Sequence, residues 1–124
     1  DVAEHMTDAH LEQLRAIFGL MEQLVATGDL VGYSTTNGRF HRVILQAAGH
    51  EFVDRLLGSL KYPLIRHQFR TMLIPGRKEQ SLAEHREILA SLERRDAPGA
   101  EQAMRRHVAR VRTILQQTAQ VPTF

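Results

Sequence analysis

The sequence contains no cysteine, which excludes disulfides and thiolate metal sites. It has no apolar run close to the ~18 residues that a membrane span needs, and no signal-peptide pattern. The formal net charge of +2 is too small to indicate a nucleic-acid-binding surface. Apolar residues do not alternate with a period of two, so strands are not expected. Together these absences favour a cytoplasmic helical protein with no membrane contact.

Apolar residues recur instead with the period of an α-helix. The chain has 124 residues, of which 43% are hydrophobic and 24% are charged, as in one globular domain with its own core. The pattern predicts an all-α antiparallel helical bundle of five helices with short connections. The first predicted helix covers residues 8–26, and the second follows Asp29 and ends at residue 48. The third begins at Glu51, the fourth follows Ser81, and the fifth begins at Asp96.

Residues that favour helix ends mark these boundaries. Thr7 is a predicted N-cap, and Gly28 ends the first helix. The triplet 74–76 (Ile-Pro-Gly) indicates a loop, and Pro63 should kink the third helix. Ser81 and Glu84 fit a capping box at the start of the fourth helix. The stretch 34–38 (Ser-Thr-Thr-Asn-Gly) is poor in helix formers, but the apolar stripe keeps its phase through it, so we predict continuous helix there.

Three histidines fall on the apolar faces of three different helices: His41, His85 and His107. Asn37 lies one turn before His41 on the same face. Neutral imidazole binds zinc, nickel, copper and iron, and facing helices of a bundle often build metal sites in the core. The alternative for each histidine is a hydrogen-bonded core residue without a metal. His67 lies on the predicted inward face of the third helix and is a further residue that could line the same cavity.

The order and spacing of several motifs resemble the FadR C-terminal (FCD) effector domain of GntR-family transcription regulators, metal-binding subclass. These motifs are Asn37-x-x-Phe40-His41, Ala47-Ala48-Gly49, Ser81-x-x-Glu84-His85-x-x-Ile88-Leu89 and Asp96-x3-Ala100-x3-Met104-x-x-His107. The resemblance runs from about Thr7 to Thr118. It implies that residues 1–124 are a ligand-binding and dimerisation domain, without the family's winged-helix DNA-binding domain and without the first helix of the family bundle.

The resemblance also implies a ligand set and partners. Asn37, His41, His85 and His107 would hold a divalent ion, zinc or nickel first, with manganese or iron as alternatives. The family more often has Asp where Asn37 stands, so the site would carry one negative charge less. The expected partners are a small carboxylate effector, a second copy of the chain, and operator DNA contacted only through the winged-helix domain.

Two arginines one turn apart, Arg66 and Arg70, lie near His67 and are candidates to clamp the carboxylate effector. A solvated helix face is the alternative for both. The sequence has no H-E-x-x-H motif or comparable general base beside the histidines, so we do not expect an enzyme. The alternatives to a metal-dependent sensor are a metal-free dimerisation module, an acyl-ligand-binding module and, least favoured, a metal-dependent enzyme.

Overall fold

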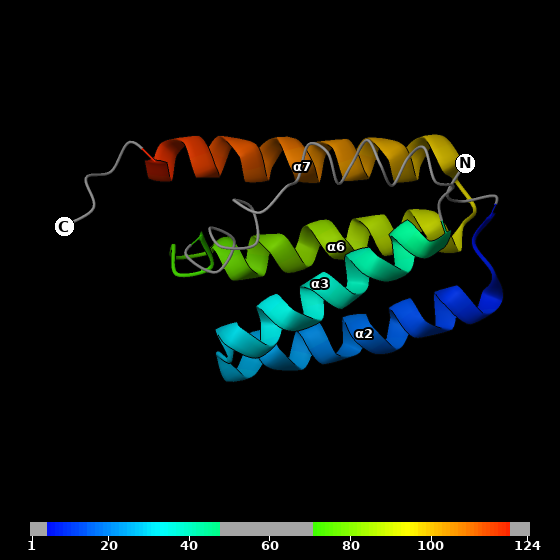
Figure 1. The fold of residues 1–124 in the computed structure, drawn as a ribbon, viewed down its shortest axis with the longest axis horizontal. Coiled ribbons are helices and arrows are strands. Elements are labelled where there is room, and N and C mark those ends of the chain that lie inside the picture. The colour runs from blue at the N-terminus through cyan, green and yellow to red at the C-terminus, as the bar shows by residue number, and fades with distance from the viewer. Residues whose placement is uncertain (1–4, 48–70, 120–124) are drawn as a thin grey trace.

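The computed structural model describes residues 5–47 and 71–119. These ranges form the helices α2 (Asp8–Thr27), α3 (Leu30–Ala47), α6 (Arg77–Glu93) and α7 (Ala97–Ala119), and they contain no strand. Helix α2 packs against α3 and α6, α6 also packs against α7, and each of these pairs runs antiparallel (Figure 1). The predicted all-α antiparallel bundle is therefore confirmed.

Apolar side chains from three helices fill the centre of the bundle. Those that are almost completely buried are Leu14 and Met21 of α2, Phe40 and Ile44 of α3, and Ile88 and Leu92 of α6. Helix α7 adds a narrower stripe, in which Ala100 and Ala103 are buried together with Met104 and Val111. No helix in the two described ranges has the length and apolar character to cross a membrane.

Four predicted helix ends are confirmed. The His10 amide donates to the Thr7 hydroxyl over 3.1 Å, and the Thr7 amide donates back to His10 Nδ1 over 3.2 Å, so these residues form a capping box at the start of α2. Gly28 ends α2 with φ 75°, a left-handed conformation that glycine adopts without strain. Asp29 and Asp96 cap the next helices, since the Gly32 amide donates to Asp29 Oδ1 over 2.9 Å and the Gly99 amide donates to Asp96 Oδ1 over 3.1 Å.

The prediction that Ser81 caps α6 is wrong. Helix α6 begins five residues earlier than predicted, at Arg77, after Gly76 with φ 83°. Residues 77–80 (Arg-Lys-Glu-Gln) are all good helix formers, so nothing in them stops the helix from starting at the glycine. Ser81 is instead buried inside the helix, and its hydroxyl lies 2.7 Å from the Tyr33 hydroxyl of α3.

The polar stretch 34–38 belongs to one continuous helix, as predicted. Tyr33 and Phe40 are completely buried on either side of it and fix α3 in the bundle. The Thr35 hydroxyl donates to the Val31 carbonyl over 3.1 Å and so does not interrupt the helix. The loop at 74–76 is also confirmed. The predicted helix from Glu51, with its kink at Pro63, lies outside the described residues.

Candidate metal centre

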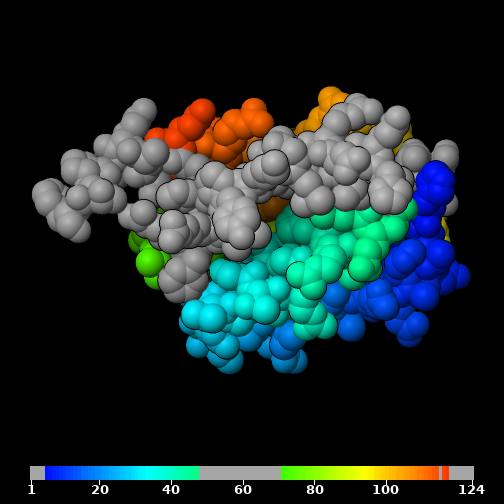
Figure 2. Space-filling view, viewed as in Figure 1, coloured from blue at the N-terminus to red at the C-terminus, as the bar shows by residue number. Residues whose placement is uncertain are grey.

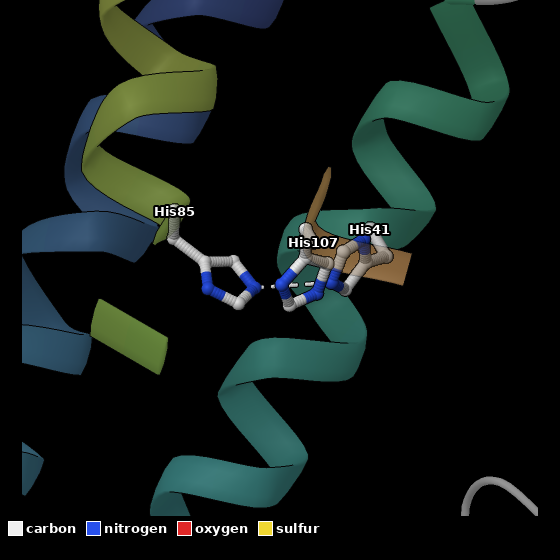
Figure 3. Close-up of side chains that lie close together, drawn as sticks. All are labelled: His41, His85 and His107. Carbon is white, nitrogen blue, oxygen red and sulfur yellow. Dashed lines mark hydrogen bonds between the residues drawn. The ribbon is translucent and has the colours of Figure 1, made fainter. Parts of the chain in front are cut away.

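The three histidines predicted to face the interior meet at one point in the bundle. His41 comes from α3, His85 from α6 and His107 from α7 (Figure 3). One ring nitrogen from each lies within 4.8 Å of the others. His85 and His107 are buried, and His41 is partly buried. This cluster can hold a metal ion.

The rings pack directly against one another. His41 stacks on His107 with ring centroids 5.3 Å apart and planes at 15°. His85 meets His41 and His107 edge to face, at 5.0 Å and 4.6 Å between centroids. Phe40, next to His41 in the chain, packs its ring edge to face on His85 at 5.1 Å. The imidazoles therefore have little freedom to turn away from their shared centre.

Two of the imidazoles are oriented by acceptors on their outer nitrogens. His85 Nδ1 lies 2.6 Å from the Ser81 carbonyl oxygen, and His107 Nδ1 lies 2.7 Å from Glu84 Oε1. A carbonyl and an ionised carboxylate only accept, so both Nδ1 atoms carry the proton in the neutral rings. The lone pairs are then on the two Nε2 atoms. His85 Nε2 lies 3.0 Å from His41 Nε2, which brings the third ring to the same point.

Burial keeps imidazoles of this cluster uncharged. Desolvation, with a smaller contribution from His107, lowers the pKa of His41 to about 3. Desolvation and the neighbouring imidazoles also hold the pKa of His85 well below its ordinary value. The neutral form is the one that binds metals, so protons do not compete for these two rings near pH 7.

Asn37 is completely buried one helical turn before His41. Neither its amide oxygen nor its amide nitrogen has a hydrogen-bond partner in the described residues. A buried amide without partners costs about 1–3 kcal/mol per unsatisfied group, so such a group needs an explanation. An ion bound beside it would use the oxygen, and an anion on that ion would accept from the nitrogen. The donor set of three neutral imidazoles and one amide oxygen fits a divalent metal.

The capping role predicted for Glu84 is wrong. Glu84 does not reach back to the Ser81 amide; it accepts from His107 and from Arg77, whose Nη1 lies 2.9 Å from Oε2. Burial alone would raise the pKa of Glu84, but the hydrogen bonds from His107 and Arg77, with the Arg77 charge, outweigh this and lower it to about 2. Arg77 and Ser81 lie four apart, and Glu84 three further on, which is the spacing of one helix face. That spacing would have identified the group if the helix had been predicted to begin at residue 77.

The residues predicted to bind the effector, Arg66, His67 and Arg70, lie outside the described residues. A cavity of about 360 Å³ between α2 and α3 is lined by none of the clustered histidines. Its lining includes Ile17, Leu20, Arg39 and Arg42. Among the described residues, the clustered metal-ligating side chains therefore lie away from this cavity. In the space-filling view α2 and α3 cover the lower part of the molecule (Figure 2).

The FCD domain family matches residues 1–110. The chain belongs to the FCD domain family. A comparison with curated proteins gives no match. FCD domains are regulatory effector-binding domains of GntR-type regulators and are not catalytic, which fits the expectation from the sequence that the chain is not an enzyme.

Proposed function

We propose that this FCD domain senses a small organic acid through a divalent ion held by Asn37, His41, His85 and His107. In this proposal the ligand-bound state controls DNA binding by a linked winged-helix domain, as part of a GntR/FadR-type transcription regulator. The observation that supports it most is the convergence of three imidazole nitrogens. Asn37, one helical turn before His41, adds a buried amide that has no partner in the described residues.

The imidazole donors bear on which metal the site would take. His41 Nε2 and His85 Nε2 are 3.0 Å apart, close enough for both nitrogens to bind one ion at about 2.1 Å. Zinc and nickel are the first candidates, with manganese and iron as alternatives. On a six-coordinate ion, four protein ligands would leave two positions for water or for the oxygens of an acid.

The charge of the site favours an anion as the effector. Three neutral imidazoles and the neutral Asn37 amide leave the two positive charges of the ion uncompensated in a poorly solvated interior. Arg77 and Arg110 surround the single carboxylate of Glu84, so these side chains add no net negative charge. A small carboxylate would supply the missing charge. That Arg66 or Arg70 binds the far end of this carboxylate effector stays a prediction.

Binding at this point would connect three helices, because the ligands come from α3, α6 and α7. A ligand that binds better to one arrangement of these helices shifts the population towards it. We propose that such a shift is what the linked DNA-binding domains respond to, in a homodimer formed through helix faces.

Calorimetric titration of metal-free protein with Ni²⁺ and Zn²⁺ tests this function. We expect one ion per chain, and a loss of binding of at least about tenfold in the variants His85→Ala and His107→Ala. His10→Ala is the matched control, because His10 caps α2 away from the cluster. Equal binding by all four proteins, or no binding by the wild type, would refute the proposal and would favour a metal-free dimerisation or acyl-binding module.

A further inference from the structure

We propose that Glu84 is a positioning residue that fixes the protonation and orientation of His107, so that the Nε2 lone pair of His107 faces the cluster. The inference rests on the proposed function for the metal itself, but its structural part concerns the metal-free protein. Glu84 lies on α6 and His107 on α7, so the contact also joins these two helices.

The contact selects one form of the imidazole. A neutral imidazole carries its proton on either nitrogen, and a metal needs the nitrogen without it. Glu84 Oε1 lies 2.7 Å from His107 Nδ1 and can only accept, so it holds the proton there. His85 obtains the same orientation from the Ser81 backbone carbonyl, 2.6 Å from its Nδ1. Glu84 is thus the side chain that does for His107 what the helix backbone does for His85.

Glu84 is itself held in place by two arginines. Arg77 donates from Nη1 to Oε2 over 2.9 Å and from Nη2 to Oε1 over 3.3 Å. Arg110 Nε lies 3.4 Å from Oε2. With His107, these contacts provide each carboxylate oxygen with two donors, so rotation of the carboxylate would break hydrogen bonds. The Arg77 side chain is only 2% exposed, and Gln80 accepts from its Nη1 over 3.1 Å.

The competing explanation is that Glu84 only joins α6 to α7 by its polar contacts. The chain offers a comparison, because Glu87 on α6 forms an ion pair with Arg106 on α7. The Glu87–Arg106 pair is exposed and does not involve a clustered histidine. A residue that merely joins the two helices should behave like Glu87. A positioning residue should change the metal site and the proton position on His107.

The experiment measures both properties in four proteins: wild type, Glu84→Ala, Glu84→Gln and Glu87→Gln. Metal affinity is measured by competition with a chelator for Zn²⁺. The position of the proton on His107 is measured by long-range ¹H–¹⁵N NMR of the metal-free proteins, with the signal assigned by its absence in His107→Gln. Wild type should show the proton on Nδ1.

Glu84→Ala should bind Zn²⁺ about 10–100-fold more weakly than wild type, the range typical for groups that orient a metal ligand. Its His107 signal should lose the Nδ1–H form. Glu84→Gln keeps an accepting oxygen, so it should keep the Nδ1–H form and lose less affinity. Glu87→Gln should match wild type in both measurements.

Two results would overturn the proposal. One is an Nε2–H form of His107 in the metal-free wild type, which does not depend on the Glu84 variants and therefore applies even if Glu84→Ala does not fold. The other is a folded Glu84→Ala protein with unchanged affinity. Failure of the wild type to bind any metal would instead refute the proposed function, and the NMR result would still decide whether Glu84 orients His107.

Discussion

Replacing Asn37 with an aspartate should change metal binding and acid binding in opposite directions. Asn37 is completely buried, and its amide has no partner in the described residues, so the substitution places a carboxylate where none of these residues satisfies it. At an effective dielectric constant of about 20, a carboxylate about 4 Å from a divalent ion gains about 8 kcal/mol. Desolvation of the buried carboxylate costs several kcal/mol of this. We expect a net gain of about 1–3 kcal/mol, or about tenfold to a hundredfold tighter metal binding.

The same change should weaken binding of a carboxylate effector to the metal-loaded protein. The added negative charge repels the acid, and the amide N–H that could donate to it is lost. Without metal, the Asn37→Asp variant should be less stable than wild type, because a buried carboxylate then has no counter-charge. Metal addition should therefore raise the melting temperature of the Asn37→Asp variant more than that of the wild type.

Competition titration with Zn²⁺ or Ni²⁺, followed by titration of acids into the loaded proteins, measures both effects. Gln46→Glu is the matched control, because it makes an equivalent amide-to-carboxylate change at an exposed position of the same helix. It should leave both affinities unchanged. Equal or weaker metal binding by Asn37→Asp would show that residue 37 does not coordinate the ion directly.

Three further measurements test the proposed function. In metal-free protein, the free energy of unfolding should decrease as pH falls below about 6.5, because the pKa of His41 is lowered to about 3 and that of His85 is also lowered, so the unfolded state takes up protons first. Glu84, with its pKa lowered to about 2, should add to this loss below about pH 4.5. Urea titrations that give the same free energy of unfolding at pH 7.5 and at pH 5 would contradict this prediction. In a panel of mono-, di- and tricarboxylates, an acid that binds should raise the melting temperature of metal-loaded protein. At a concentration of 100 times Kd the stabilisation is about 2.7 kcal/mol, and a chelator should remove most of it. Acids that stabilise metal-free protein equally would argue against a metal-bound effector. Sedimentation of the isolated domain should show a dimer that does not bind operator DNA specifically, and a monomer or a sequence-specific complex would be the opposite result.

The helical pattern and the histidine cluster could be predicted because both follow from local spacing. A period of 3.6 residues places Leu14, Phe40 and Ile88 inside, and it places three histidines inside by the same rule. The helix ends at Thr7, Asp29 and Asp96 depend on contacts within three or four residues of the chain, which a sequence shows directly.

The role of Glu84 could not be predicted from spacing alone. A serine followed three residues later by glutamate fits a capping box and also fits one face of a buried helix turn. Which one forms is decided by partners far away in the sequence, Tyr33 for Ser81 and His107 for Glu84. The start of α6 differs from the predicted one because Gly76 takes a left-handed conformation, so the helix begins directly after it.

Anomalous X-ray diffraction from a crystal of metal-loaded protein, collected at the absorption edge of the bound ion, tests the central claim most directly. We expect one strong peak per chain, about 2.1 Å from a ring nitrogen of each of His41, His85 and His107, with the Asn37 side-chain oxygen beside it. A crystal in which the metal is absent from this point, with the three imidazoles bonded only to protein groups or water, would contradict the claim.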